Sequence, residues 1–226
     1  MLFKRLLDIL VSFIVLLLLA PLFIPLMIAL RFSGEGEVFY RQKRIGYKNQ
    51  PFYITKFATM LKDSPNIGTG EHTLRDDPRV LPLGKFLRSS KINELAQVLD
   101  VLAGKMSIIG PRPTTPGHHA LYPDFYDDVL AKVPPGMTGV GSIVFRDEEY
   151  ILSIAKDHDY CYAHEIVPYK AELERWYAEN RSFFMDLTLF FLTFWAIVRP
   201  SSTVVRKIYP SIPYKDISSF GQTVKK

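Results

Sequence analysis

The chain has only one cysteine, Cys161, among its 226 residues. A single cysteine cannot form an intrachain disulfide, so the composition suits a reducing compartment and excludes a disulfide-stapled fold. The five histidines show no zinc-type spacing with Cys161, and no glycine-rich phosphate loop of the GxxxxGK type occurs. Internal repeats and low-complexity tracts are also lacking. These absences argue against a zinc module, a P-loop nucleotide-binding protein and a repeat protein.

The formal net charge is +5, which favours an anionic partner such as nucleic acid, acidic lipid or a phosphorylated substrate. The basic residues do not gather into one patch with interleaved aromatics, so we expect no nucleic acid as partner. A binder of acidic lipid or nucleic acid that uses its basic charge alone is the weakest of the alternatives. The length fits one domain with an appendage, and oligomeric state is left open.

The residues that are present in excess are apolar and lie at the N-terminus. From Ile9 to Leu30 the sequence runs for 22 residues without a charge. A helix needs about 20 such residues to cross a bilayer core, so we expect a membrane segment. A cleaved signal peptide is disfavoured because the run is long and continues into the basic residue Arg31.

Pro21 and Pro25 lie inside this run, where each removes a helical hydrogen-bond donor, so a bend or break is predicted. Basic residues flank the run on both sides, for example Lys4 before it and Arg31 after it, and the positive-inside rule therefore assigns neither end to the outside. A re-entrant helix satisfies both flanks. The alternative is a kinked spanning helix that serves only as an anchor.

The rest of the chain predicts an α/β fold that is mostly helical. Residues 37–44 and 51–57 are expected to form a small β-hairpin, and residues 62–78 a loop. A helix is expected to start near Ile92, capped by Ser89 or Ser90, and to stop at Gly104. Later helices are predicted at 124–133, 147–164 and 169–180, with a core or interfacial helix at 187–198. The predicted organisation is a proline-broken re-entrant helix (1–31), one cytoplasmic domain on the membrane surface (32–200) and an irregular basic tail (201–226).

Two places carry candidate chemistry in the first half of the domain. Alternation along the second strand puts Lys56 on an apolar face, where it either snorkels to water or meets a phosphate. Near Ile92, Arg88 offers a bidentate fork, the helix start favours an anion, and Glu94 beside Asn93 could hold Mg²⁺ that bridges phosphate oxygens. The plain alternative is that Glu94 only complements the helix dipole and Arg88 is a solvated surface residue.

Two further motifs follow. Arg112 lies between two prolines, and this stiff backbone suits diphosphate recognition, although the prolines could serve only to shape the loop. After the Pro135–Gly139 turn, Arg146 and Asp147 open an acidic stretch with Glu148, which could bind substrate or simply start a helix.

A set of short motifs occurs in one order over residues 3–198. It comprises Lys4-Arg5 with Asp8, the apolar helix with its prolines, Phe39-Tyr40-Arg41-Gln42, Arg44-Ile45-Gly46, Lys56-Phe57 with Thr59-Met60, Asp77-Pro78-Arg79-Val80, Gly84-Lys85-Phe86-Leu87-Arg88, Asn93-Glu94-Leu95 with Gln97, Met106-Ser107, Gly110-Pro111-Arg112-Pro113 and Pro135-Gly136-Met137-Thr138-Gly139. This ordered set resembles the bacterial sugar transferases, the monotopic phosphoglycosyl transferases.

The resemblance implies a re-entrant membrane helix and a cytoplasmic domain resting on the bacterial inner membrane. It implies an enzyme that transfers a sugar phosphate from a UDP-sugar to undecaprenyl phosphate, a polyprenyl phosphate, and releases UMP. This reaction is the first membrane step of surface polysaccharide, lipopolysaccharide or glycoconjugate synthesis, and magnesium is the implied cofactor. An Asp-Glu pair supplies the family's nucleophile and metal-linked acid, and Glu94 matches its second member.

Asn93 stands where the family has its nucleophilic Asp, and a neutral amide has no anionic oxygen with which to attack phosphorus. Three interpretations follow. The polyprenyl phosphate attacks directly, with Glu94 and magnesium neutralising charge. Another carboxylate, Asp147 or Glu148, takes over. In the third, the chain is a catalytically inactive scaffold or an Asp-to-Asn variant.

Overall fold

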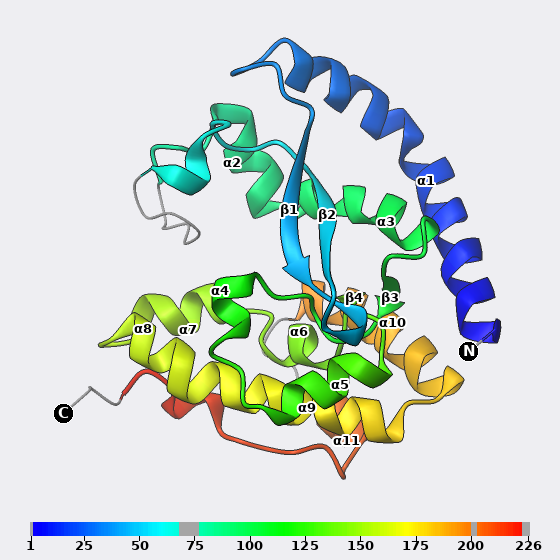
Figure 1. The fold of residues 1–226 in the computed structure, drawn as a ribbon, viewed down its shortest axis with the longest axis vertical. Coiled ribbons are helices and arrows are strands. Elements are labelled where there is room, and N and C mark those ends of the chain that lie inside the picture. Colours follow the sequence, from blue (N-terminus) through cyan, green and yellow to red (C-terminus); the bar gives the residue numbers. More distant parts are fainter. Residues whose placement is uncertain (1, 68–76, 200–202, 223–226) are drawn as a thin grey trace. The chain divides into compact units, whose positions relative to one another are not determined.

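A computed structural model describes residues 2–67, 77–199 and 203–222 (Figure 1). Part of the loop expected at 62–78 and the end of the expected tail lie outside these residues. The chain divides into two compact units. The helix–hairpin unit comprises Leu7–Lys43 and Tyr53–Gly104, and the carboxy-terminal unit comprises Met1–Leu6, Arg44–Phe52 and Lys105–Lys226. The predicted fold class is confirmed in its coarse form, mostly helical with small sheets and one long apolar N-terminal helix, whereas the predicted domain boundaries stay a prediction.

Helix α1 spans Leu2–Arg31 and contains both prolines. Of the two predicted outcomes, a bend or a break, the structure has the bend: the helix continues through Pro21 and Pro25 and curves along its length (Figure 1). Residues four apart lie on one face of a helix, so both missing donors fall on the same side, where a gentle bend accommodates them. Most of the α1 surface is not covered by protein, since only 17% of its most apolar 18-residue window is buried.

The helix–hairpin unit packs α1 against the hairpin and two short helices. Strands β1 (Phe39–Ile45) and β2 (Pro51–Phe57) pair with each other and are joined by the 3₁₀ turn η1 (Tyr47–Asn49). The end of the hairpin that carries η1 belongs to the carboxy-terminal unit. The elements η2 (Ser64–Asn66), α2 (Pro82–Ser89), η3 (Ile92–Gln97) and α3 (Val98–Leu102) follow. The core of this unit consists of Phe23, Leu26, Leu30, Phe57, Leu87 and Ala96.

The helix expected to start near Ile92 begins as the 3₁₀ segment η3 rather than as an α-helix. The residue that precedes it is Lys91 in the left-handed conformation (φ 60°), and no side chain caps it. The expected serine cap is wrong, because the Ser89 and Ser90 hydroxyls both donate to the Phe86 carbonyl at the end of α2. The predicted stop is confirmed: Gly104 has φ 79°, the left-handed conformation that favours glycine at a helix end.

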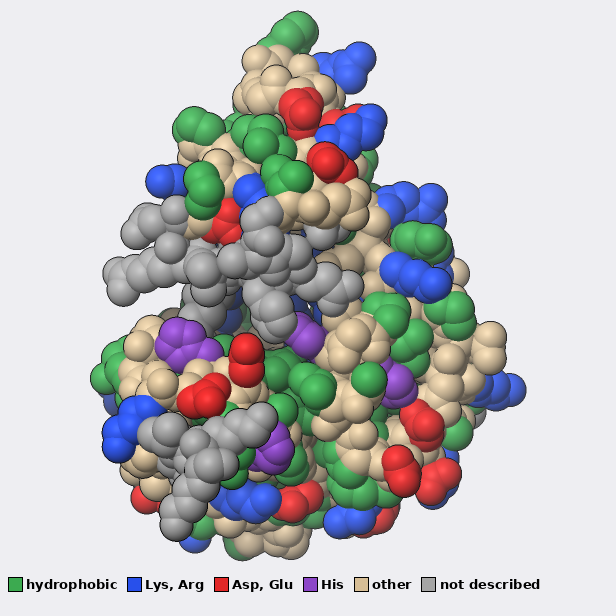
Figure 2. All heavy atoms as spheres, turned by 60° about the vertical axis from the view of Figure 1, so that its left-hand side comes forward, with side chains coloured by type: hydrophobic (Ala, Val, Ile, Leu, Met, Phe, Trp, Pro, Cys, Tyr) green, Lys and Arg blue, Asp and Glu red, His purple; other side chains and the backbone are tan. Residues whose placement is uncertain are grey.

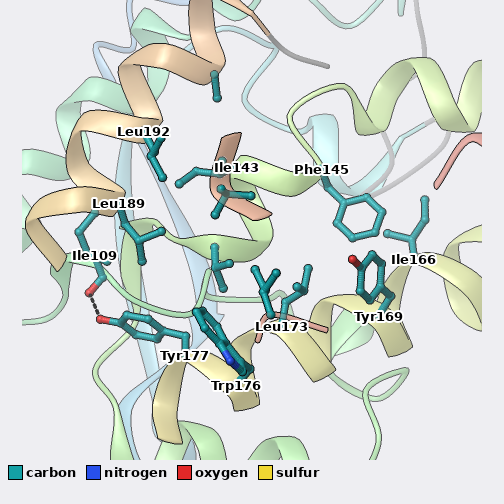
Figure 3. Close-up of a cluster of buried hydrophobic side chains, with 14 of the residues drawn as sticks. Ile109, Ile143, Phe145, Ile166, Tyr169, Leu173, Trp176, Tyr177, Leu189 and Leu192 are labelled. Carbon is teal, nitrogen blue, oxygen red and sulfur yellow. Dashed lines mark hydrogen bonds between the residues drawn. The ribbon is translucent and has the colours of Figure 1, made fainter. Parts of the chain in front are cut away.

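The carboxy-terminal unit contains a short parallel pair, β3 (Ser107–Ile109) and β4 (Gly136–Thr138), in the register Ser107 to Gly136 and Ile109 to Thr138. Its helices are α4 (Pro116–His119), α5 (Phe125–Lys132), α6 (Val140–Val144), α7 (Glu148–Ile154), α8 (His158–Cys161), the π-helical η4 (Tyr162–Ile166), α9 (Val167–Asn180) and α10 (Phe183–Val198). Side chains of α6, α9 and α10 form half of the core (Figure 3).

The segment expected as an irregular basic tail contains α11 (Val204–Ile208) and the 3₁₀ turn η5 (Ile217–Ser219). Its apolar side chains Val205, Ile212 and Phe220 are buried in the core of the carboxy-terminal unit. Tyr169 on α9 donates a hydrogen bond to the Pro213 carbonyl (3.0 Å). Burial of scattered apolar side chains thus attaches a segment that was expected to be irregular.

Candidate functional site

Lys56 and Glu94 form an ion pair within the helix–hairpin unit. Lys56 Nζ lies 3.2 Å from Glu94 Oε1, with side chains 15% and 23% exposed, so both heads still reach solvent. Asp100 on α3 holds the strand beside Lys56: its carboxylate accepts from the Thr55 backbone N–H (2.6 Å) and from the Thr55 hydroxyl (3.2 Å). The register of β2, and with it the position of Lys56, is therefore tied to the short helix that follows Glu94.

Asn93 is buried, with 6% of its surface exposed. Its side-chain oxygen Oδ1 has no hydrogen-bonding partner among the described residues. A buried carbonyl oxygen without a donor is uncommon in folded proteins and costs about 1–3 kcal/mol. Arg88, at the end of α2, directs Nη1 to the Met60 sulfur (3.7 Å), which is a weak acceptor. Arg88, Asn93, Glu94 and Lys56 thus belong to one unit, and a direct contact between Lys56 and Glu94 joins two of them.

Arg112 lies in the carboxy-terminal unit, on the loop that leaves β3. Its Nη1 donates to the Met137 carbonyl (3.3 Å) on β4. The loop is fixed on both sides, because Gly136 N donates to Pro111 O (2.8 Å) and Arg44 donates to Pro113 O (3.2 Å). The predicted stiff mounting of this arginine therefore has a physical basis in backbone hydrogen bonds as well as in the two prolines.

Tyr162 and His118 were not predicted as site residues. The Tyr162 hydroxyl lies 3.4 Å from His118 Nδ1, and the ring centroids are 5.0 Å apart. Burial raises the pKa of Tyr162, while the guanidinium groups of Arg44 and Arg112 oppose that rise, which places both arginines within electrostatic reach of the phenol. No sequence pattern links these residues, since they lie on four separate segments of the chain.

Arg146 and Asp147 connect α6 to α7. Asp147 precedes α7 as its N-cap residue, and its side chain caps no backbone N–H. Glu148 forms an ion pair with Lys170 on α9. Arg146 and Asp147 belong to the same unit as Arg112. Their predicted role in substrate binding stays a prediction.

The candidate residues form two sets. Lys56, Arg88, Asn93 and Glu94 belong to the helix–hairpin unit, and Arg112, Arg146 and Asp147 to the carboxy-terminal unit. Within the described parts of the chain, no group of three or more His, Cys, Asp or Glu side chains could hold a metal ion. On the face drawn in Figure 2, basic and acidic side chains are interspersed and form no patch of one sign.

Comparison with known proteins decides the family. The sequence model described as bacterial sugar transferase matches residues 1–200 of this chain. The chain belongs to this family. The match includes α1, both sets of candidate residues and most of the carboxy-terminal core.

Individual relatives are identical to this chain at about one residue in three. The exopolysaccharide production protein ExoY of Sinorhizobium fredii is 34% identical over 172 residues, which are 70% of this chain and 76% of that protein. ExoY of Rhizobium meliloti is 32% identical over 209 residues, 86% of this chain and 84% of that protein. The UDP-glucose:undecaprenyl-phosphate glucose-1-phosphate transferase of Klebsiella pneumoniae is 34% identical over 196 residues, 85% of this chain but 39% of that longer protein.

Proposed function

We propose that this protein is a membrane-associated phosphoglycosyl transferase that moves a sugar phosphate from a UDP-sugar to a polyprenyl phosphate and releases UMP. The names of its relatives support the general reaction, since the Klebsiella pneumoniae and Escherichia coli proteins are UDP-glucose:undecaprenyl-phosphate glucose-1-phosphate transferases. The glucose donor named there belongs to those relatives. For this chain the sugar is left open.

One observation carries the proposal: an apolar helix and a charged cluster share one packed unit. Leu30 at the end of α1 is 1% exposed and packs with Phe57 and Ala96, and Leu95 lies against the same cluster. Lys56 precedes Phe57, and Glu94 precedes Leu95. An acceptor with a phosphate head and a polyprenyl tail needs both surfaces in one place, because its head must meet charge while its tail stays in an apolar environment.

The reaction needs positioning and charge neutralisation more than covalent chemistry. An oxygen of the polyprenyl phosphate attacks the β-phosphorus of the UDP-sugar, the bond from that phosphorus to the bridging oxygen breaks, and UMP leaves with the electron pair. Lys56 and Arg88 in the helix–hairpin unit, and separately Arg112 in the carboxy-terminal unit, are the groups that would bind phosphate and offset its charge. The residues fit magnesium, since this ion binds through one or two protein oxygens together with substrate phosphates: Glu94 and the buried Asn93 Oδ1 would hold it, and it would neutralise charge on the phosphate oxygens.

Direct attack by the polyprenyl phosphate is the form of the reaction that suits Asn93. This amide is buried, and its free oxygen can accept a hydrogen bond or a cation but cannot act as an anionic nucleophile. Glu148 is engaged by Lys170, so it is a poor replacement. The alternative is a catalytically inactive membrane scaffold that keeps the shape of the substrate site.

Turnover in lipid nanodiscs tests this proposal. The purified protein receives undecaprenyl phosphate, Mg²⁺ and a panel of UDP-sugars, and UMP release is followed. We expect release from at least one donor, and Glu94→Gln to lower the rate at least about a hundredfold, the usual cost of losing a group that stabilises charge in the transition state. Absence of UMP from every donor, with Asn93→Asp restoring it, would make the natural chain an inactive scaffold.

We further propose that α1 is re-entrant, entering and leaving the membrane from the cytoplasmic face. Lys4 near its start is held in the carboxy-terminal unit by Asp186 (2.6 Å) and the Ile109 carbonyl (2.8 Å). Leu30 near its end is buried in the helix–hairpin unit. The chain also passes between the two units at 43–44, 52–53 and 104–105, and α1 is the one helix among the described residues that is long and apolar enough to cross a membrane. These later passages therefore involve no crossing, which supports placing both ends of α1 on the same side of the membrane.

The α10 helix supports membrane contact independently. One side of it is buried in the core through Leu189 and Leu192, whereas Phe184, Phe191 and Val198 are 77%, 62% and 77% exposed. A 16-residue helix is too short to span a bilayer, and an exposed aromatic face suits the headgroup layer.

Cysteine labelling tests the topology. In a Cys161→Ser background, Phe3→Cys and Phe32→Cys lie at opposite ends of α1 and are highly exposed, at 78% and 87%. We expect a membrane-impermeant maleimide to label both from the cytoplasmic side of inverted vesicles. Labelling of the two positions from opposite sides would establish a spanning helix instead.

A further inference from the structure

Glu174 is a buried carboxyl that the proposed reaction does not use. It lies in the middle of α9, is 3% exposed, and its Oε1 accepts a hydrogen bond from the Gly141 backbone N–H (3.2 Å). Its other oxygen, Oε2, has no hydrogen-bonding partner among the described residues. Burial raises the pKa of Glu174 to about 8, with the Gly141 N–H and Lys170 opposing the rise. At neutral pH the side chain is therefore mainly an uncharged acid.

The carboxyl lies against the backbone that mounts Arg112. A Cβ at Gly141 would come within 2.6 Å of Glu174 Oε1, so a side chain there would displace the carboxyl from its present position. A Cβ at Gly139 would lie 2.3 Å from the Gly110 carbonyl and 3.7 Å from Glu174 Oε2. The carboxyl therefore contacts the turn between β4 and α6 at the point where that turn meets the start of the arginine loop.

This turn is part of the strand pair that holds Arg112. Gly110 N donates to Thr138 O (3.0 Å), and Arg112 Nη1 donates to Met137 O (3.3 Å), so β4 is bonded both to the loop backbone and to the guanidinium. The Glu174 carboxyl accepts a hydrogen bond from the backbone N–H of Gly141, which lies three residues beyond Thr138. A displacement at Gly141 is consequently passed along β4 to the carbonyl that orients Arg112.

We infer that Glu174 is a positioning residue for Arg112, and that its buried carboxyl keeps the β4–α6 turn in the form that binds the nucleoside diphosphate of the donor. This inference rests on the proposed function, which assigns Arg112 to that diphosphate. Ionisation would place a charge on an oxygen without a donor, and the turn must then open to hydrate it. Donor affinity is therefore lost when Glu174 ionises.

Among the described residues, four charged or titratable side chains interact with this carboxyl. Lys170 lies on the same helix, one turn away, and Tyr177 lies on it in the other direction. Tyr122 and Tyr126, beside and within α5, interact with it electrostatically, and both have raised pKa values because they are buried. The packed helix α6 carries no titratable side chain. None of the three tyrosines ionises between pH 7 and 9, so Glu174 is the group of this cluster that changes charge in that range.

The test is UDP binding to the full chain in nanodiscs with Mg²⁺, measured by titration calorimetry from pH 7 to pH 9. The wild-type affinity is expected to fall as the pH passes about 8. Glu174→Gln keeps an oxygen for Gly141 and cannot ionise, so it should match wild type at pH 7 and stay constant to pH 9. Glu174→Ala should bind about tenfold more weakly throughout, since a small misplacement of a positioning group has a large effect.

Two controls separate the possible failures. Ile166→Ala removes a fully buried side chain eight residues earlier on the same helical run and should leave UDP affinity unchanged while it destabilises the fold. Arg112→Ala should weaken binding. If Arg112→Ala binds UDP as wild type does, the assignment of Arg112 fails, and this inference falls with it.

If Arg112→Ala weakens binding but Glu174→Ala does not, the inference alone is overturned. Identical pH profiles for wild type and Glu174→Gln would also overturn it. That comparison decides the matter even if Glu174→Ala fails to fold, which circular dichroism would reveal.

Discussion

The two units differ in what their ion pairs hold in place. In the helix–hairpin unit Lys56 and Glu94 pair near the surface, at 15% and 23% exposure, and Asn93 holds an amide oxygen without a donor among the described residues. In the carboxy-terminal unit the Lys4–Asp186 pair, at 20% and 7% exposure, also holds backbone, because Lys4 donates to the Ile109 carbonyl (Figure 3 shows the neighbouring Tyr177–Ile109 hydrogen bond). Oε2 of Glu174 is left without a partner among the described residues. The first arrangement leaves groups ready for a ligand, and the second fixes backbone.

This difference predicts how each unit responds to mutation. Changes in the helix–hairpin cluster should affect turnover more than stability, because an ion pair that still reaches solvent contributes less to folding than a buried one. Changes beneath the arginine loop should affect stability first, because buried polar groups are costly to leave unmatched. Four substitutions test the contrast, in order of decreasing expected effect.

Lys4→Met should have the largest effect on stability. The Asp186 carboxylate accepts from Lys4 (2.6 Å) and from the Tyr177 hydroxyl (2.5 Å) and is almost fully buried. Removing the ammonium leaves a buried charge with only the phenol, which should cost about 3 kcal/mol. Thermal unfolding in detergent measures the loss. The double variant Lys4→Met, Asp186→Asn removes the charge as well and should recover part of it; no recovery would show that the packing of Lys4 matters and its charge does not.

Gly139→Ala should be next, at about 2–3 kcal/mol, the usual range for overpacking a close contact. The φ of Gly139 is −177°, an extended conformation open to any residue, so the expected effect comes from the 2.3 Å approach of a Cβ to the Gly110 carbonyl. Gly36 is the matched control in the other unit: its φ of 73° makes alanine strained there without a backbone atom closer than 3.2 Å. We expect Gly36→Ala to cost about 1 kcal/mol. Equal losses of denaturation midpoint would contradict the contrast.

The sequence predicted the parts of the fold that have strong local patterns. The uncharged run identified α1, and alternation identified the hairpin that bears Lys56. The sequence left a bend and a break open at the prolines, and the bend is found because two prolines four residues apart affect one face only. The predicted serine cap is wrong because another acceptor, the Phe86 carbonyl, takes the hydroxyls. In both places two local interactions compete, and sequence spacing does not say which one prevails.

The candidate residues also differ in whether a sequence pattern marks them. Arg112 and Glu94 were found because prolines and a motif mark them, whereas Tyr162 and Glu174 are placed by tertiary packing alone. In the sequence, Glu174 lies within a helix rich in charged residues, which is typical of a solvated position. The neighbouring residues do not predict that it is only 3% exposed. Its significance depends on two glycines more than thirty positions away.

Glu174→Gln should raise stability at neutral pH, by about 1–2 kcal/mol, since it removes the cost of keeping a carboxyl buried. With a folded pKa of about 8 and an ordinary unfolded pKa near 4.5, the folded state holds more protons between these values. Wild-type stability should therefore fall as pH rises from about 4.5 to 8 and then level off, whereas the variant lacks this component. Urea unfolding at pH 5, 7 and 8.5 measures both; parallel curves would mean that Glu174 is already ionised in the fold.

Thr55→Val should have the smallest effect and isolates what holds Lys56 in place. Valine keeps the shape and the strand preference of threonine but removes the hydroxyl that donates to Asp100 (3.2 Å). The shorter bond from the Thr55 backbone N–H to the same carboxylate (2.6 Å) is untouched. We expect a loss of about 1 kcal/mol and a rate of UMP release within twofold of wild type. Asp100→Ala removes both bonds and should lower that rate much further, because β2 is then free to shift Lys56 away from Glu94. Equal rates in the two variants would mean that the position of Lys56 does not depend on the hydrogen bonds between Thr55 and Asp100.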